Sequence, residues 1–274
     1  MDRSEKYRSF YAKLVCTAAN VDDPRIEEAF RSVRREPFAG SGPWSMGHPY
    51  VQTPDDDPAF LYQNLLLALD RERGINIGMP SLHALWLGSC NIKPGETVLQ
   101  VGAGSGYYTA ILAHLVGPDG RVYAYEIDEA LGARARENLS KQNQVEVRIR
   151  SGVAPDLPQT NLIYVCAGAA QPSRMWLDAL RPGGRLLFPL APEGIFGGML
   201  LITRPDQGST WSARFVTRAM FIGCVGLQDE EVGRRLTEAF SKSWDRVRSL
   251  RLDGSPDDSC WFAGDGWWLS TAEG

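Results

Sequence analysis

The chain has 274 residues, 43% of them hydrophobic, so it can bury a sizeable core as one large domain and is not a disordered chain. Its net charge of −4 argues against a nucleic-acid partner, and the absence of an apolar run of ~20 residues argues against a membrane span. The five cysteines form no CxxC pair, the three histidines are scattered, and the start shows no secretory pattern, so we expect a cytoplasmic protein without a disulfide framework or a metal site.

Residues 1–92 are expected to be mostly helical. Two aspartates precede Pro24, and apolar residues then recur at helical spacing, which predicts a helix with an aspartate cap. Residues 40–58 are rich in Gly and Pro and predict a long loop. The stretch PSLHALWLGSC begins at Pro80 and predicts a short buried helix.

Strand and helix patterns alternate from residue 93 to residue 227. Short apolar runs predict strands at ETVLQVG, GRVYAYEI, VEVRIR, NLIYVCAG, RLLFPL, GGMLLIT and ARFVTRAMFIG. The segments YYTAILAHLV, DEALGARARENLSKQ and SRMWLDAL predict helices, the second of them capped by Asp128. This alternation predicts an α/β fold with a mostly parallel sheet that helices cover on both faces.

The last part of the chain is rich in tryptophan. DEEVGRRLTEAFSKSW predicts a helix, and RVRSLRL and SCWFAGDGWWLS follow it. This tail holds Trp244, Trp261, Trp267 and Trp268, four of the eight tryptophans in the chain. A lid, a platform for a peptide, a dimer surface and an ordinary β-hairpin packed on the domain all fit this composition. We divide the chain into an N-terminal segment 1–92, a central domain 93–227 and a C-terminal α+β extension 228–274.

Glycines occupy alternate positions in VLQVGAGSGYYTA, at Gly102, Gly104 and Gly106, directly after a predicted strand. A bare turn at a strand's carboxyl end lets a ligand approach the backbone closely. The spacing differs from the dinucleotide fingerprint, and Ala103 rules out the hydrolase elbow. Glu126 ends the next strand, where a carboxylate can accept hydrogen bonds from ribose hydroxyls. The combination predicts a site for an adenosine-containing ligand, and the alternative is a plain turn with an exposed glutamate.

The segment VLQVGAGSGYYTAILAHLVGPDGRVYAYEID resembles the binding segment of class I S-adenosylmethionine-dependent methyltransferases, and within them most resembles the protein-L-isoaspartate O-methyltransferase family. The resemblance continues through NLIYVCAGAA and ALRPGGRLLFPL, reaches back to DPRIEEAFRSVRREPF and INIGMPSLHA, and is weakest over residues 37–72. It implies a Rossmann-like mixed, mostly parallel sheet, S-adenosylmethionine as the cofactor, and methyl transfer as the reaction.

The resemblance also implies which residues bind the cofactor. Glu126 is expected to hold the ribose, Ile127 to form a wall for the adenine, and Tyr107 either to stack beside the cofactor or to pack in the core. Gln100 stands where the family usually has an acid, and Ser151 replaces a second acid beside the adenine. The expected cofactor-binding residues are Gln100, Gly102, Ala103, Gly104, Gly106, Tyr107, Glu126, Ile127, Ser151 and Gly152.

The acceptor side is expected at Ile77, Gly78, Pro80 and His83, with Gly78 and His83 as the catalytic candidates. Gly78 stands where the family carries a serine or threonine close to the reacting carboxylate. The missing side chain predicts room for a bulkier acceptor, weak turnover on generic isoaspartyl peptides, and a gain of that turnover in Gly78→Ser. His83 either borders the acceptor or is an ordinary buried histidine.

A carboxylate acceptor is ionised at neutral pH, so methyl transfer to it needs orientation and exclusion of water rather than a base. We therefore expect an S-adenosylmethionine-dependent O-methyltransferase that esterifies a carboxylate of a peptide or protein. The acceptor is an isoaspartyl residue, or an aspartyl or C-terminal carboxylate of a biosynthetic precursor peptide. A small-molecule methyltransferase and a non-catalytic cofactor-binding module are the alternatives. The expected partner is a peptide or protein, not nucleic acid or a membrane, and the extension could mediate a homodimer.

Overall fold

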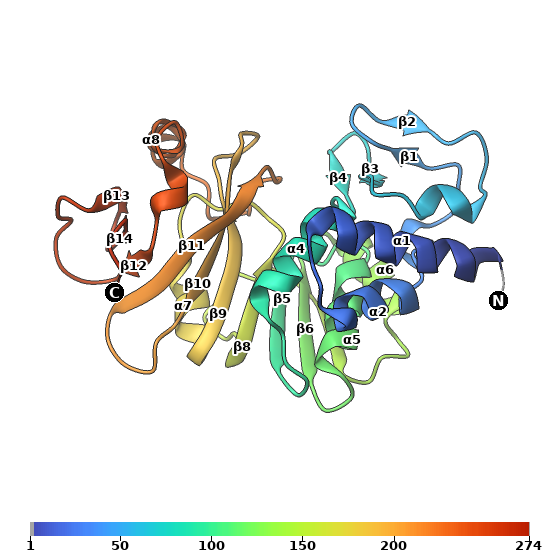
Figure 1. Cartoon of the computed structure of the whole chain (residues 1–274), viewed down its shortest axis with the longest axis horizontal. Helices are drawn as coiled ribbons and strands as arrows, with labels where there is room; N and C mark the ends of the chain where they lie inside the picture. Colours follow the sequence, from blue (N-terminus) through green and yellow to red (C-terminus); the bar gives the residue numbers. More distant parts are fainter. Residues whose placement is uncertain (1–2, 274) are drawn as a thin grey trace. The chain divides into compact units, whose positions relative to one another are not determined.

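The computed structural model describes residues 3–273 (Figure 1). Contacts divide the chain into two compact units. The first comprises Met1–Glu96 and Ala103–Arg150, and the second comprises Thr97–Gly102 and Ser151–Gly274. The three segments expected from the sequence stay a prediction, because these units divide the chain at other places.

The first unit contains six helices within its described residues, and their starts follow from local capping. Asp23 accepts a hydrogen bond from the Arg25 N–H at the start of α2, and Asp128 accepts one from Leu131 at the start of α6. The predicted helix PSLHALWLGSC forms in full, with Pro80 at its first position. The bounds are α1 Arg3–Ala19, α2 Pro24–Ser32, α3 Glu36–Ala39, α4 Pro80–Cys90, α5 Tyr107–Val116 and α6 Glu129–Asn138.

Short strands in the first unit correct the expectation of a long loop over residues 40–58. β1 pairs with β2 inside that segment, where the hydroxyl of Thr53 accepts a hydrogen bond from the Trp44 N–H. β3 and β4 form a second small hairpin, and β6 lies parallel to β7. Residues 1–92 are thus less helical than expected. The bounds are β1 Ser45–Met46, β2 Val51–Gln52, a 3₁₀ turn at Pro58–Leu61, β3 Ala68–Asp70, β4 Ile75–Asn76, β6 Arg121–Glu126 and β7 Val145–Ile149.

The second unit is built on a mixed sheet with strand order β13-β14-β12-β11-β10-β9-β8-β5. β5, β8 and β9 are parallel neighbours, and the strands from β9 to β13 pair antiparallel. The α/β fold with a mixed sheet is confirmed, with a larger antiparallel part than "mostly parallel" implies, because the tail adds three strands. The bounds are β5 Thr97–Val101, β8 Thr160–Val165, α7 Arg174–Ala179, β9 Leu180–Leu190, β10 Gly197–Thr203, β11 Thr210–Ala219, α8 Glu230–Phe240, a 3₁₀ turn at Trp244–Arg246, β12 Ser249–Arg251, β13 Cys260–Gly264 and β14 Trp267–Ser270.

The tryptophan-rich tail packs on the second unit through an aromatic cluster centred on Phe215 of β11. The Phe215 ring lies 5.1 Å from the ring of Phe240, 5.9 Å from Trp244 and 5.4 Å from Trp261, all edge to face. Edge-to-face pairs at these distances stabilise a core beyond the area that they bury. The tail is therefore part of the core of this unit, as the packed-hairpin interpretation predicts.

Deletion of residues 228–274 is accordingly expected to destabilise the protein. The deletion removes three rings that pack on Phe215, together with the strand that pairs with β11. Removal of one buried aromatic side chain alone costs about 3–5 kcal/mol, so the loss of the whole cluster should leave little soluble, cooperatively folded protein. Soluble yield and thermal unfolding measure this outcome, and a soluble truncated chain with an unchanged melting temperature would show that the tail is an independent appendage.

Candidate active site

The glycine turn that follows β5 adopts left-handed backbone conformations. Gly102, Gly104 and Gly106 have φ angles of +77°, +57° and +96°. A Cβ at Gly106 would lie 2.8 Å from the side chain of Leu139, so glycine there also allows close packing between α5 and α6. A Cβ at Gly104 would meet only Leu69, at 3.4 Å. Backbone conformation rather than crowding therefore requires glycine at position 104.

Glu126 ends β6 beside this turn and is 7% exposed. Its Oε2 accepts a hydrogen bond from the Gly104 N–H at 2.6 Å, and its Oε1 accepts one from the Asp128 N–H at 3.0 Å. Burial raises the pKa of this carboxyl group, and the backbone donors oppose that shift. Each carboxylate oxygen has two lone pairs, so the carboxylate keeps acceptor capacity for a ligand hydroxyl. The side chain of Ile127, next in the chain, is 54% exposed.

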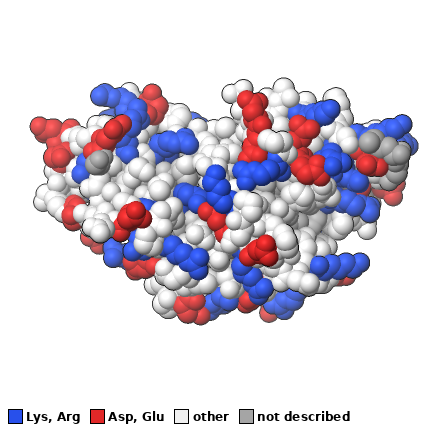
Figure 2. Space-filling model, turned by 60° about the horizontal axis from the view of Figure 1, so that its bottom comes forward, with Lys and Arg blue, Asp and Glu red and all other residues white. Residues whose placement is uncertain are grey.

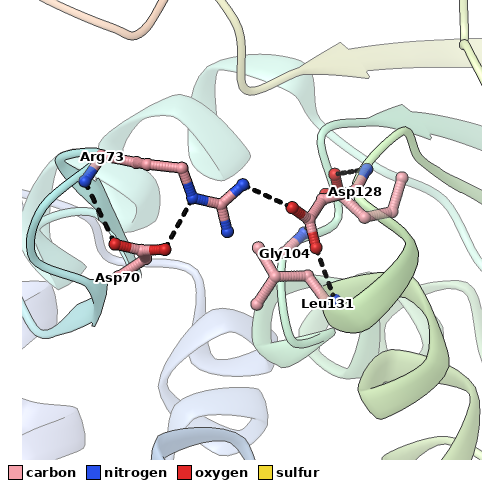
Figure 3. A network of polar contacts seen from close by, with 6 residues as sticks. Asp70, Arg73, Gly104, Asp128 and Leu131 are labelled. Atoms are coloured by element: carbon pink, nitrogen blue, oxygen red, sulfur yellow. Dashed lines mark hydrogen bonds and ion pairs between the residues drawn. The ribbon is translucent and has the colours of Figure 1, made fainter.

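Arg73, which the sequence reasoning missed, joins two acidic side chains at the edge of this site (Figure 3). Its Nε donates to Asp70 Oδ2 and its Nη1 donates to Asp128 Oδ2, both at 2.6 Å. Asp128 also caps α6 through its other oxygen, 2.9 Å from the Leu131 nitrogen. No sequence signal links Arg73 to Asp128, because 55 residues separate them.

The predicted acceptor residues include a close pair, Gly78 and His83. A Cβ at Gly78 would lie 2.3 Å from His83 Nε2, a distance that real Cβ atoms do not reach. The imidazole stacks on the Tyr108 ring at 3.5 Å with an interplanar angle of 8°, and the Tyr108 hydroxyl donates to the Gly78 carbonyl at 3.4 Å. The expectation of extra room at Gly78 is therefore wrong, because the His83 ring fills it.

His83 is 2% exposed, and burial lowers the pKa of its imidazole to about 3. The ring is thus neutral at pH 7, where it can offer one donor and one acceptor nitrogen but no charge. Pro80 starts the helix that carries His83, and Ile77, 5% exposed, precedes Gly78. The four acceptor-side residues thus lie along one continuous segment of the first unit.

Tyr107 lies in the core of the first unit. Its side chain is 1% exposed, and its ring lies 6.5 Å from that of Phe30 and 5.6 Å from that of Phe38. The side chain therefore packs, as one of the two interpretations expected. A contact between this residue and the cofactor stays a prediction.

Four predicted cofactor residues belong to the second unit. Gln100 is buried in β5, with Nε2 3.9 Å from the sulfur of Cys166, and a Cβ at Gly102 would lie 3.3 Å from the Cys166 carbonyl oxygen. The hydroxyl of Ser151 accepts from the Val153 N–H at 3.1 Å. The carbonyl of Gly152, the fourth, accepts a hydrogen bond from the Trp176 indole N–H. These contacts fix the local backbone and leave the adenine-side role as a prediction.

Residues 3–273 contain no group of three or more His, Cys, Asp or Glu side chains that could hold a metal ion. Every helix in the same range is too short or too polar to cross a membrane. Neither finding identifies a ligand, so the chemistry of the site rests on the glycine turn, on Glu126 and on the residues around Gly78.

Comparisons with known proteins place the chain among methyltransferases. It is 43% identical to a protein-L-isoaspartate O-methyltransferase of Aeropyrum pernix over 56% of this chain and 60% of that relative. It is 31% identical to a protein-L-isoaspartate O-methyltransferase 2 of Syntrophobacter fumaroxidans over 74% of this chain and 76% of that relative. Less than two thirds of the Aeropyrum relative is therefore matched.

The fold is shared with solved structures of the same description. A Plasmodium falciparum protein-L-isoaspartate O-methyltransferase in complex with S-adenosyl-L-homocysteine superposes with a TM-score of 0.63, at 19% identity, over 79% of this chain and 97% of that chain. The profile of the protein-L-isoaspartate(D-aspartate) O-methyltransferase family matches residues 12–229. The chain therefore belongs to the protein-L-isoaspartate(D-aspartate) O-methyltransferase family.

Proposed function

We propose that this chain is an S-adenosylmethionine-dependent O-methyltransferase that esterifies a carboxylate of a peptide or protein. The predicted methyltransferase family is confirmed, and the cofactor is part of our proposal. The acceptor and the roles of individual residues are our proposal. The observation that carries it is the buried Glu126 carboxylate bound to the N–H of Gly104 at the tip of the glycine turn.

The residues of the turn fit the cofactor. The Glu126 carboxylate keeps acceptor capacity beyond its backbone donors, which suits hydrogen bonds from ribose hydroxyls. Gly104 presents bare backbone beside that carboxylate. Ser105 Oγ is buried, and no residue of the range 3–273 hydrogen-bonds to it. Gly104, Ser105 and Glu126 would hold the adenosine end of the cofactor, and Ile127 offers an exposed apolar side chain beside it.

When bound, the cofactor supplies a methyl group on a positively charged sulfur, which is already a strong electrophile. The protein then has to hold the acceptor carboxylate in line with that methyl group and keep water away. His83 is neutral at pH 7 because burial lowers its pKa, so it places no charge beside the proposed acceptor segment. No base is required, since a carboxylate with a pKa of about 4 is already ionised at pH 7.

The identity of the carboxylate is open between two classes. Room at Gly78 would favour a specialised aspartyl or C-terminal carboxylate, but the His83 ring fills that space. We therefore propose an isoaspartyl carboxylate as the first acceptor to test and the other peptide carboxylates as the second.

We propose a peptide or protein as the partner rather than nucleic acid. On the face drawn in Figure 2, Lys and Arg alternate with Asp and Glu, whereas a nucleic-acid partner favours a clustered basic stripe. A cytoplasmic location is proposed as well, in keeping with the free thiols of Cys16, Cys224 and Cys260. A homodimer stays a prediction, and β13, an edge strand of the sheet, is the proposed contact with a second copy.

The proposal is tested by incubation with methyl-labelled S-adenosylmethionine and peptides that carry isoaspartyl, aspartyl or free C-terminal carboxylates. We expect label that mild base releases as methanol, because methyl esters hydrolyse readily whereas N-methyl groups do not. Base-stable label would indicate an amine acceptor. Labelling of small carboxylic acids but of no peptide would indicate a small-molecule enzyme, and cofactor binding without any transfer would indicate a binding module.

Glu126→Ala is expected to weaken binding of S-adenosylhomocysteine by about 1.5–3 kcal/mol, the range for hydrogen bonds to a charged group. Titration calorimetry measures this, with Glu129→Ala as the matched control, because Glu129 is an exposed carboxylate three residues further on. An analogue that lacks a ribose hydroxyl shows whether Glu126 binds the ribose or affects affinity indirectly. If that analogue loses the same affinity with wild type and with Glu126→Ala, Glu126 does not hold the ribose.

A further inference from the structure

We propose that Arg73 is a positioning residue of the cofactor site: it holds the β3–β4 hairpin against the glycine turn and so slows release of the cofactor. The inference rests on the proposed function, because it takes the turn and Glu126 to be the cofactor site. It adds a residue that neither the glycine turn nor the family resemblance assigns. Its basis is a chain of contacts within the first unit (Figure 3).

The hairpin lies directly against the turn. Leu69 lies in the middle of β3, and its Cδ1 atom would be 3.4 Å from a Cβ atom added to Gly104. Ile77, just after β4, donates its N–H to the Leu67 carbonyl at 2.7 Å, which closes the base of the hairpin. The hairpin thus brings an apolar side chain to the glycine whose N–H is bound to Glu126.

Arg73 lies in the tight turn between β3 and β4 and joins this hairpin to Asp128, which follows β6. Asp70 accepts from the Arg73 N–H at 3.1 Å and from its Nε at 2.6 Å, which fixes the guanidinium on the hairpin. The Nη1 atom then reaches Asp128 at 2.6 Å. A guanidinium can serve two carboxylates at once because its donors form a rigid fork, whereas a lysine ammonium is a single point charge.

This series of contacts ends at the Glu126 carboxylate, the proposed ribose-binding group. Asp128 donates its N–H to Glu126, and Glu126 accepts from Gly104. Asp128 is 19% exposed and Asp70 is 29% exposed, so both carboxylates are partly shielded from water. The Leu131 N–H and Arg73 both hold the pKa of Asp128 below its usual range, which keeps this partner ionised. A displacement of the hairpin therefore has to break an ion pair that is anchored one residue from the proposed adenine wall.

The side chain of Arg73 is 54% exposed, so we expect its ion pair with Asp128 to contribute only a small free energy. Exposed ion pairs contribute at most about 1 kcal/mol, which corresponds to about a fivefold change in an equilibrium constant. Salt screens such pairs, with a Debye length that falls to about 3 Å at 1 M. The effect of Arg73 should therefore be small, located in the dissociation rate, and sensitive to ionic strength.

The test uses the full-length chain and S-adenosylhomocysteine. The variant is Arg73→Met, and the matched control is Arg71→Met, which removes the same charge from the same turn at an exposed position. Dissociation of radiolabelled S-adenosylhomocysteine into an excess of unlabelled compound gives the rate, and calorimetry gives the affinity. Arg73→Lys keeps the charge and loses the fork, so it should fall between wild type and Arg73→Met.

We expect Arg73→Met to release S-adenosylhomocysteine about fivefold faster at low salt, with Arg71→Met unchanged and the difference lost near 1 M salt. Equal rates for the two methionine variants, or a difference that persists at high salt, would overturn the role of Arg73. A wild-type chain that binds no S-adenosylhomocysteine would instead overturn the proposed cofactor site, and with it the proposed role of Arg73. Melting temperatures of all variants separate a general loss of stability from faster release.

Discussion

Gly104→Val is expected to abolish binding of S-adenosylhomocysteine while the chain stays folded. Gly104 has a φ of +57°, a conformation that costs a residue with a side chain about 1–2 kcal/mol and a β-branched residue more. The substitution also displaces the N–H that Glu126 accepts at 2.6 Å. The loss of this contact and the bulk added against Leu69 of β3 should lower the affinity by about a hundredfold or more.

Gly95→Val is the matched control for backbone strain. Gly95 has a φ of +81° and no neighbour within 4 Å of an added Cβ, and it precedes β5 rather than following it. Both variants should therefore lose stability, and only Gly104→Val should lose the ligand in calorimetry. Normal affinity in Gly104→Val, or an equal loss in both variants, would remove the glycine turn from the cofactor site.

Gly78→Ser should destabilise the protein and reduce its turnover, contrary to what the sequence alone predicts. The added Cβ would lie 2.3 Å from His83 Nε2, so the imidazole has to leave its stack on Tyr108 or the backbone has to move. Overpacking of this kind costs about 1–3 kcal/mol of folding free energy. A displacement of about 1 Å at an acceptor site can lower the rate by up to about a hundredfold.

The double variant Gly78→Ser/His83→Ala tests this explanation, because the shorter side chain returns the space that the serine needs. We expect the double variant to lose less stability than the sum of the losses in Gly78→Ser and His83→Ala, which is a favourable coupling between two residues in contact. Thermal and urea unfolding measure the stability, and the peptide assay measures the turnover. A Gly78→Ser protein with wild-type stability and turnover would show that the His83 ring adapts without cost.

Much of the fold could be predicted from local signals. Pro80 and Asp128 mark the starts of α4 and α6, and the apolar runs at β5, β6 and β8 are long enough to predict strands. The two small hairpins could not be predicted, because their strands have only two or three residues. Their positions depend on contacts such as the bridge between Met46 and Leu67, which no short window of sequence contains.

The candidate site also contains residues that the sequence could predict and residues that it could not. The glycine turn and Glu126 carry signals in residue type and spacing, and the structure brings Gly104 and Glu126 together. Gly78 and His83 are only five residues apart, yet their contact depends on how the chain turns into α4, and composition does not reveal that geometry. Arg73 lies in a charged turn that is indistinguishable in sequence from an ordinary solvated one. Its partner, Asp128, is fixed by the fold.

The most direct test of the account is mass spectrometry of an isoaspartyl peptide and its aspartyl twin after incubation with S-adenosylmethionine. Wild type and Gly104→Val are compared side by side, so that any methylation can be assigned to the cofactor site of this chain. The account predicts a methyl ester on the peptide carboxylate with wild type only, located by fragmentation and lost as methanol in mild base. A wild-type chain that binds the cofactor and leaves every carboxylate of both peptides unmodified, the C-terminus included, would contradict it.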